Sequence, residues 1–160
     1  MSLGLAVLTI SDSAASGERV DESGDAAESL LASLDLGPIQ RGLVQDDLDS
    51  IVKSLRTYVL EGLALVVTTR GTGFGPRDVT PEATKTAIDR EAPGLAELMR
   101  SAGTAHTPLV ALSRGLVGIS DGTLIVNLPG SPKAVKESLE ALLLVIPHAL
   151  RVLRGGTDHS

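Results

Sequence analysis

Residues 68–82 read Thr-Thr-Arg-Gly-Thr-Gly-Phe-Gly-Pro-Arg-Asp-Val-Thr-Pro-Glu, and this stretch decides how the rest of the chain is interpreted. It follows the continuous apolar run Leu63–Val67, which is typical of a strand buried on both faces. It ends where Thr80 suits a helix N-cap and Pro81 suits the first turn. Glycines between a strand and a helix let backbone N–H groups surround phosphate oxygens, because no Cβ blocks their approach. The same glycines also occur in simple turns, so both interpretations stay open at this point.

The stretch matches neither of the two common nucleotide-binding motifs. No Gly-Lys-Ser/Thr sequence of a Walker loop is present, and the glycines at 71, 73 and 75 do not have the spacing of the dinucleotide fingerprint. Any nucleotide site here must therefore belong to another class.

Strand and helix patterns alternate on both sides of this stretch. An Asp121-Gly122 pair predicts a hairpin, Asp46 stands where an N-cap is expected, and Pro147 is expected to kink the last helix before Gly155-Gly156 ends it. This order predicts a three-layer α/β/α sandwich with a mostly parallel sheet and an antiparallel edge, as one domain over residues 1–156 with a tail at 157–160. The predicted strands are 5–10, 39–44, 63–67, 117–119 and 123–128, and the predicted helices lie within 26–34 and 48–59, begin at 80, run from 93 to about 102, and run from 132 to 153.

Three polar segments follow predicted strands directly, namely Ser11–Ser13, Thr68–Gly75 and Asn127–Ser131. Parallel strands end at one edge of a sheet, and ligands of such sheets bind beyond that edge, so we expect the three segments to share a site. The turn Pro129-Gly130-Ser131-Pro132 offers backbone N–H groups at a helix N-terminus, which suits an anion, although it also suits a rigid turn. Lys133 could assist there or be solvated.

Composition excludes several functional classes. The net charge of −6 argues against neutralisation of a nucleic-acid backbone, and an aromatic content of 1% leaves no stacking surface for single strands. The chain has no cysteine, so it has no disulfide or thiolate metal site. Its apolar runs are too short for a membrane span, and the first ten residues lack the pattern of a signal peptide. We therefore expect a cytoplasmic protein without nucleic-acid or membrane partners.

The full string at 68–82 resembles the Gly-Gly-Thr-Gly … Arg-Asp-Val-Thr-Pro-Glu-Ala-Thr signature of the MogA/MoaB-like molybdopterin adenylyltransferases, a family that includes gephyrin and the plant Cnx G domains. Segments that agree in order and spacing are Ser11-Asp12, Leu112-Ser113-Arg114 and Asn127–Pro132. The resemblance covers 5 to about 154, and it implies the molybdopterin-binding fold. One departure is Arg70, which stands where the family usually has the first glycine of its Gly-Gly pair.

The resemblance implies a reaction and a pair of carboxylates. The family joins AMP from ATP to the terminal phosphate of molybdopterin and releases pyrophosphate with the help of Mg²⁺, a step that requires oxygen ligands for the metal and donors for the phosphates. Asp78 and Asp46 match the family's carboxylates for catalysis and metal binding. Asp46 could instead serve only to cap a helix, Asp78 could be a surface acid beside Arg77, and Asp47 is interpreted as a bystander.

The resemblance also places substrate-binding residues on the loops. Ser113 matches a serine on the molybdopterin side, although it could equally be an ordinary serine at a strand edge. The three histidines, at 106, 148 and 159, show no metal-ligand spacing and receive no role. The full set predicted to bind substrate or nucleotide is Ser11, Asp12, Thr69, Gly71, Thr72, Gly73, Ser113, Asn127, Pro129 and Gly130.

Two other functions remain open from the sequence. The chain could be a molybdopterin-binding or cofactor-assembly module without catalysis, or a CinA-like hydrolase on the same fold. Retention of both Asp46 and Asp78 favours the enzyme, because a simple binder needs no carboxylate pair for Mg²⁺. The resemblance also implies a homo-oligomer, trimer or hexamer, and a molybdate-insertion enzyme as partner, and it leaves the molybdenum and tungsten pathways undistinguished.

Overall fold

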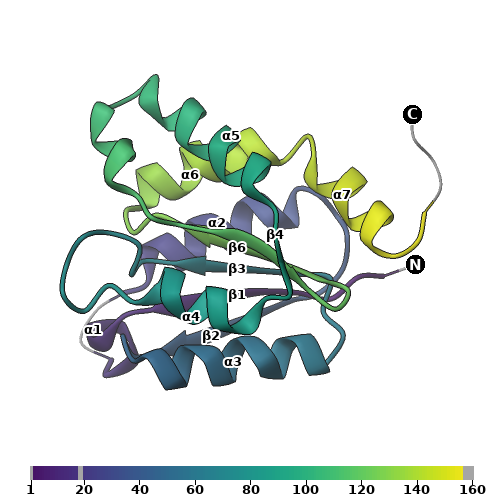
Figure 1. Cartoon of the computed structure of the whole chain (residues 1–160), viewed down its shortest axis with the longest axis horizontal. Helices are drawn as coiled ribbons and strands as arrows, with labels where there is room; N and C mark the ends of the chain where they lie inside the picture. Colours follow the sequence, from purple (N-terminus) through teal and green to yellow (C-terminus); the bar gives the residue numbers. More distant parts are fainter. Residues whose placement is uncertain (1, 18–19, 157–160) are drawn as a thin grey trace.

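A six-stranded sheet forms the centre of the molecule in the computed structural model, which describes residues 2–17 and 20–156 (Figure 1). The predicted tail at 157–160, with His159, lies outside the described residues. The strand order is β2-β1-β3-β6-β5-β4, in which β1, β2, β3 and β6 run parallel and β5 runs antiparallel to both of its neighbours. The strands are β1 (Leu5–Ile10), β2 (Ile39–Val44), β3 (Leu65–Thr69), β4 (Arg90–Glu91), β5 (Val117–Ser120) and β6 (Thr123–Leu128).

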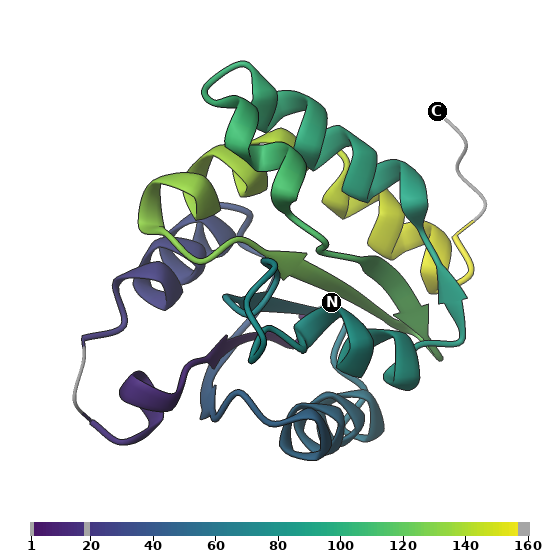
Figure 2. The same ribbon diagram turned by 60° about the vertical axis from the view of Figure 1, so that its left-hand side comes forward.

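Helices cover both faces of the sheet, which confirms the predicted three-layer sandwich with its antiparallel edge (Figure 2). One face carries α3 and α4, and the other carries α2, α5, α6 and α7. The helices are α1 (Asp12–Ala15), α2 (Glu22–Ala32), α3 (Leu48–Leu60), α4 (Thr80–Ala87), α5 (Pro93–Thr104), α6 (Pro132–Leu142) and α7 (Ile146–Leu153), with a 3₁₀ turn η1 (Pro108–Leu112). No described helix is both long and apolar enough to cross a bilayer.

The central strands supply side chains to two apolar cores. In β1, Leu5 and Val7 pack among α2, α6 and α7, whereas Ala6, Leu8 and Ile10 pack against α3 and α4. Successive side chains of a strand point to opposite faces, so a strand covered on both sides must be apolar throughout. All six residues of β1 are buried, as expected from the continuous apolar run.

Residues 70–79, called the glycine loop below, connect β3 to α4. The strand that leads into this loop lies two residues later than predicted. β3 spans Leu65–Thr69 rather than 63–67, because it pairs in register with Leu5–Thr9 of β1. The carbonyl of Leu63 instead accepts a hydrogen bond from the Thr123 hydroxyl at 2.6 Å. The glycine loop therefore begins at Arg70, directly at the end of the strand.

Two predicted helix caps were wrong. Asp47, not Asp46, caps α3, since its carboxylate accepts hydrogen bonds from the Ser50 N–H at 3.0 Å and the Ser50 hydroxyl at 2.7 Å. Thr80 is the first residue of α4 rather than its N-cap, and its hydroxyl donates to the Arg70 carbonyl at 3.0 Å. Asp46 is therefore not used to cap a helix, and the Thr80 side chain is hydrogen-bonded to the glycine loop.

The long final helix is two helices. α6 ends at Leu142 and α7 begins at Ile146, so the chain breaks before Pro147 instead of kinking at it. Proline fits the first turn of a helix, where its missing N–H has no partner to lose. Three short elements escaped prediction, namely α1, β4 and η1, each of five residues or fewer.

Candidate functional site

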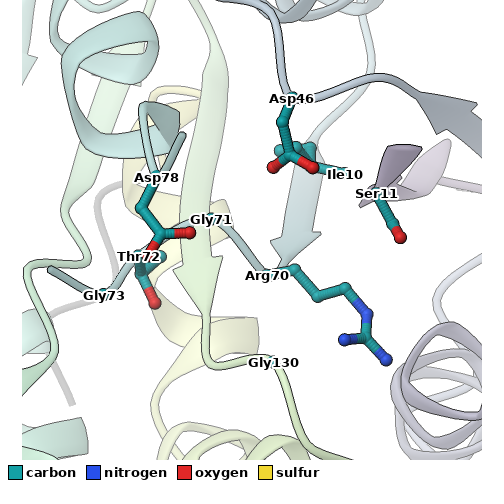
Figure 3. A pocket seen from close by; sticks show the side chains of 9 residues that line it. All are labelled: Ile10, Ser11, Asp46, Arg70, Gly71, Thr72, Gly73, Asp78 and Gly130. Atoms are coloured by element: carbon teal, nitrogen blue, oxygen red, sulfur yellow. The ribbon is translucent and has the colours of Figure 1, made fainter. Parts of the chain in front are cut away.

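A pocket of about 390 Å³ opens at the carboxyl ends of β1 and β3, as the parallel sheet predicts. Figure 3 shows its side chains, which come from the β1 end, the β2–α3 loop, the glycine loop and the β6–α6 turn. The lining residues are Ile10, Ser11, Asp46, Arg70, Gly71, Thr72, Gly73, Asp78 and Gly130.

The structure brings part of the predicted site into this pocket. Both predicted carboxylates line it, together with Ser11, Gly71, Thr72, Gly73 and Gly130. Of the lining residues, Ile10 and Arg70 were not among the predicted ones, and only Arg70 carried a sequence signal, through its departure from the family glycine. The predicted residues that do not line the pocket are Asp12, Thr69, Ser113, Asn127 and Pro129.

Asp46 is held at the pocket by a reciprocal pair of hydrogen bonds with Asp12. The Asp46 N–H donates to the Asp12 carboxylate at 3.0 Å, and the Asp12 N–H donates to the Asp46 carboxylate at 3.2 Å. Burial raises the pKa of Asp46, and the negative charges of Asp12 and Asp78 add to this effect. The Asp12 N–H and the positive charge of Arg77 counteract it only in part. Asp78 is therefore close enough to Asp46 for the two carboxylates to repel each other.

Asp78 reaches the pocket because the loop in front of it is built from glycines. Its carboxylate accepts a hydrogen bond from the Gly75 N–H at 2.9 Å. A Cβ on Gly75 would lie 2.8 Å from that carboxylate, and one on Gly73 would lie 3.0 Å from it, so side chains at these positions would displace Asp78. In Figure 3 the carboxylates of Asp46 and Asp78 face a common space on either side of Gly71.

The first two residues of the loop adopt left-handed backbone conformations. Gly71 has a φ of 74°, and a Cβ there would collide with the Thr80 hydroxyl and lie 3.6 Å from the Asp46 carboxylate. Arg70 has a φ of 76°, a conformation that costs a residue with a Cβ about 1 kcal/mol or more. The turn at 70–71 thus keeps a conformation suited to two glycines although its first residue is an arginine.

Arg114 clamps the loop and was not assigned a role from the sequence. Its side chain donates to the Gly73 carbonyl at 2.8 Å, the Asp78 carbonyl at 2.8 Å and the Glu82 carboxylate at 2.7 Å, while its own N–H donates to the Thr72 carbonyl at 2.8 Å. The hydrogen bond from Arg114 lowers the pKa of Glu82. No local pattern could have revealed this clamp, since it joins residues 32 to 42 positions apart.

A second arginine closes the other side of the loop. Arg77 donates to the Asp12 carboxylate, at 2.6 Å from its terminal nitrogen, and to the Asp46 carbonyl at 3.4 Å. Asp12 does not line the pocket, and its two carboxylate oxygens accept from Arg77 and from the Asp46 N–H. It holds the loop against the β2–α3 connection.

The other predicted residues lie behind or beside the pocket. Asn127 is buried in β6, where its amide donates to Thr68 at 3.0 Å and Thr84 at 2.9 Å and accepts from the Leu116 N–H at 3.0 Å. Thr69 is also buried. Ser113, Asn127 and Pro129 contribute to a second, smaller recess, which adjoins the pocket at the Pro129-Gly130 step. These side chains support the site rather than line its main pocket.

The turn before α6 is stabilised from within. Ser131 caps the helix by accepting from the Ala134 N–H at 3.1 Å, and the Ser23 hydroxyl donates to the Gly130 carbonyl. Lys133 is exposed and lies 4.0 Å from Glu137. Within residues 2–17 and 20–156, no group of three or more His, Cys, Asp or Glu side chains is arranged to hold a metal ion.

Comparison with known proteins agrees with this geometry. The family model described as "Probable molybdopterin binding domain" matches residues 6–149. A molybdopterin adenylyltransferase of Helicobacter pylori J99 is 42% identical over 154 residues, which cover 94% of this chain and 88% of that protein. The molybdenum cofactor synthesis protein cinnamon of Drosophila melanogaster is 41% identical, but the match covers 95% of this chain and only 26% of that larger protein.

A solved structure of a molybdopterin biosynthesis enzyme is also similar to this chain. The molybdopterin biosynthesis enzyme MoaB of Thermus thermophilus superimposes with a TM-score of 0.87 at 50% identity, over 96% of this chain and 97% of that one. The resemblance inferred from residues 68–82 is thereby confirmed across the fold. The chain belongs to the molybdopterin-binding domain family whose members include the molybdopterin adenylyltransferases.

Proposed function

We propose that this protein is a molybdopterin adenylyltransferase of molybdenum cofactor biosynthesis that uses ATP and Mg²⁺. The observation that carries the proposal is the pairing of Asp46 and Asp78 in one pocket beside the backbone of the glycine loop. Relatives that carry this name match nearly the whole chain, such as the enzyme of Escherichia coli at 36% identity.

The proposed reaction is a nucleotidyl transfer. A terminal phosphate oxygen of molybdopterin attacks the α-phosphorus of ATP, a new P–O bond forms, and the bond between the α-phosphorus and the bridging oxygen breaks. The electron pair of that bond leaves with pyrophosphate. Charge neutralisation and positioning account for most of the catalysis in such reactions, because the phosphate groups already carry the reactive bonds.

The residues present fit Mg²⁺. The ion prefers oxygen ligands and is commonly held by one or two carboxylates together with substrate phosphates and water, and two carboxylates are what this pocket offers. The mutual repulsion that helps to raise the pKa of Asp46 is the condition that a bound cation relieves. When bound, Mg²⁺ supplies neutralisation of the charge on the phosphates.

The chain's own groups orient the substrates. The glycine loop presents backbone N–H groups, and Arg114 and Arg77 fix the two sides of this loop so that Asp78 and Asp46 keep their separation. Ser113 lies at the second recess, where its hydroxyl accepts from the Gly115 N–H at 3.3 Å and remains able to donate to a ligand. We place ATP in the main pocket and the pterin at the rim beside Ser113, because the recess itself, at about 10 Å³, is too small to enclose a pterin.

The alternative function is a molybdopterin-binding or assembly module without catalysis. Asp46 favours the enzyme, because it is not needed to cap α3, a task that Asp47 performs. A carboxylate that is partly buried next to another carboxylate lowers the stability of a protein, so a simple binder gains nothing from keeping it.

One experiment tests the function directly. Purified protein is incubated with molybdopterin, ATP and Mg²⁺, and the products are analysed for adenylylated pterin and pyrophosphate. Formation of both in equal amounts is expected. Binding of the pterin without pyrophosphate release would establish the binding module instead.

Self-association, a cytoplasmic location and delivery of product to a molybdate-insertion enzyme complete the proposal. Exposed apolar side chains at the α6–α7 connection and on α7 support association, since Leu144 is 92% and Val152 48% exposed. Light scattering coupled to gel filtration distinguishes a trimer or hexamer from a monomer.

A further inference from the structure

Arg70 alone carries a positive charge among the described residues that line the pocket. Figure 3 shows its side chain extending away from Asp46 and Asp78, on the side of the pocket where Gly130 lies. The pocket therefore has an acidic side, formed by the two carboxylates, and a basic side, formed by this guanidinium.

The three arginines around the glycine loop differ in their contacts. Arg77 and Arg114 are both committed to protein oxygens, on Asp12 and Asp46 for the former and on Gly73, Asp78 and Glu82 for the latter. Within residues 2–17 and 20–156, no hydrogen bond or ion pair engages the guanidinium of Arg70. Its five N–H donors therefore have no protein acceptor in this part of the chain.

The backbone conformation at Arg70 also indicates a role for its side chain in the pocket. A φ of 76° suits glycine, and an arginine holds it only because the Thr80 hydroxyl bonds its carbonyl and the Pro129 carbonyl accepts from its N–H at 3.4 Å. Glycine would satisfy this turn without strain. The side chain of Arg70 therefore adds nothing to the fold that glycine would not provide, and its contribution must lie in the pocket.

We propose that Arg70 binds a phosphate group of the substrate, through a forked pair of hydrogen bonds, on the side of the pocket opposite the carboxylate pair. This inference rests on the proposed function for the identity of the substrates. A guanidinium presents parallel N–H donors that match two oxygens of one phosphate. Gly130 packs beside the stem of this side chain, since a Cβ there would lie 3.4 Å from Cγ of Arg70.

The charge distribution explains why a cation is useful at this position. Asp46 and Asp78 repel a phosphate-bearing ligand, and a metal ion held by them would offset this repulsion on one side only. A fixed positive charge on the opposite side attracts the ligand and orients its phosphates along the line between the carboxylate pair and Arg70. Two phosphate groups could occupy this place, one from the triphosphate of ATP and one from the terminal phosphate of molybdopterin.

The test compares binding to Arg70→Gly, Arg70→Gln and Arg70→Lys with binding to the wild-type protein by titration calorimetry at low ionic strength. The ligands are ATP with Mg²⁺, inorganic tripolyphosphate, molybdopterin, and adenosine as a ligand without phosphate. Both Arg70→Gly and Arg70→Gln should weaken binding of the contacted phosphate ligand about tenfold, which equals about 1.4 kcal/mol. Arg70→Lys should retain part of the affinity, because it keeps the charge but not the fork.

Two control variants separate this effect from changes in the backbone or the net charge. Asp121→Gly relieves the same kind of left-handed conformation, φ 53°, at the β5–β6 turn far along the sheet from the pocket. Arg56→Gln removes one positive charge from α3. Both should bind every ligand like the wild-type protein. Thermal unfolding should show Arg70→Gly to be at least as stable as the wild-type protein, which excludes misfolding.

The outcomes are distinguishable. Weaker binding of ATP and tripolyphosphate assigns the contact to the triphosphate, and weaker binding of molybdopterin alone assigns it to the pterin phosphate. Unchanged binding of all phosphate ligands by Arg70→Gly, an equal loss for adenosine, or no binding of any phosphate ligand by the wild-type protein overturns the inference. Wild-type protein that binds these ligands but releases no pyrophosphate would contradict the proposed function, while the affinities would still decide the role of Arg70.

Discussion

Two clusters of acidic side chains flank β1 and β2, one around Arg41 of β2 and one at the pocket, and their partly buried carboxylates have opposite surroundings. In the first cluster Arg41 donates to Asp21 at 2.7 Å, to Asp25 at 2.9 Å and to Glu28 at 2.8 Å. In the second, Asp46 and Asp78 line the pocket, and Arg77 of the loop pairs with Asp12 instead of with either of them. An arginine donates directly to the carboxylates of the first cluster, whereas within residues 2–17 and 20–156 no ion pair joins the carboxylate of Asp46 or Asp78 to a cation.

The pKa shifts follow this difference. Burial by itself raises the pKa of Asp21, but hydrogen bonds from the Thr9 hydroxyl, the Gly24 N–H and Arg41 outweigh it and hold that pKa below its ordinary value. Burial raises the pKa of Asp46 as well, and there the neighbouring carboxylates add to it. Partial burial thus gives opposite results, depending on whether donors or acids surround the carboxylate. A cluster that the protein leaves uncompensated is the one suited to an external cation.

The largest expected effect concerns the uncompensated pair. Asp78→Asn or Asp46→Asn keeps the size of the side chain but removes an anionic oxygen ligand, so turnover should fall at least about a hundredfold, or roughly 2.7 kcal/mol of transition-state stabilisation. The loss of turnover is measured as the rate of pyrophosphate release over a range of Mg²⁺ concentrations. Asp47→Asn is the matched control, because asparagine still caps α3 and the residue does not line the pocket. Near-normal turnover of Asp78→Asn would remove the catalytic assignment.

A smaller effect is expected at the clamp that positions Asp78. Arg114→Lys keeps the charge but cannot reach Gly73, Asp78 and Glu82 together, so turnover should fall about tenfold, or about 1.4 kcal/mol. If the clamp acts by orienting Asp78, the Mg²⁺ concentration needed for half-maximal turnover should rise as well. A variant that only lost stability would show a lower melting temperature with an unchanged Mg²⁺ dependence. Glu82→Gln, which leaves both loop carbonyls bound, should have the milder effect.

The compensated cluster should affect stability and not turnover. Asp21→Asn can still accept from the Gly24 N–H through its single oxygen, but its NH2 group then replaces the oxygen that accepts from Thr9 and Arg41, so the charge-assisted bond is lost and the free energy of unfolding should fall by about 1 kcal/mol. For a domain of this size that corresponds to a melting temperature about 3 °C lower. Pyrophosphate release by the folded variant should remain near the wild-type rate. A large loss of turnover would show that the first cluster also serves the reaction.

Sequence reasoning reached the pocket because the order of strands determines which loops meet. Strands that end at Ile10 and Thr69 in a parallel sheet bring their loops to one edge, whatever the side chains are. It could not decide between Asp46 and Asp47 as the cap of α3, because adjacent aspartates have the same capping propensity and only the backbone turn selects one. The contacts of Arg41 and Arg114 join distant segments, so no local pattern encodes them. The break between α6 and α7 was missed because the apolar residues continue across it.

The smallest expected effect is also the sharpest test of the comparison, because it predicts opposite signs. The lowered pKa of Asp21 means that its ionised form stabilises the fold, a contribution present above its ordinary value of 3.8 and lost as the pH falls through the folded-state value. The raised pKa of Asp46 means the reverse, so its protonated form is the more stable, and that stability is lost as the pH rises through the folded-state value.

Asparagine mimics the protonated acid. Without metal at pH 7, Asp46→Asn should therefore stabilise the protein slightly, by less than about 0.5 kcal/mol because solvent screens a partly exposed group, whereas Asp21→Asn destabilises it. Both differences from the wild-type protein should shrink below pH 3.8, as measured by urea unfolding between pH 3 and pH 7. Saturating Mg²⁺ and ATP should reverse the sign for Asp46→Asn, because only the wild-type carboxylate gains from the cation. If Asp46→Asn destabilises the metal-free protein at pH 7, the two clusters do not differ in the way proposed.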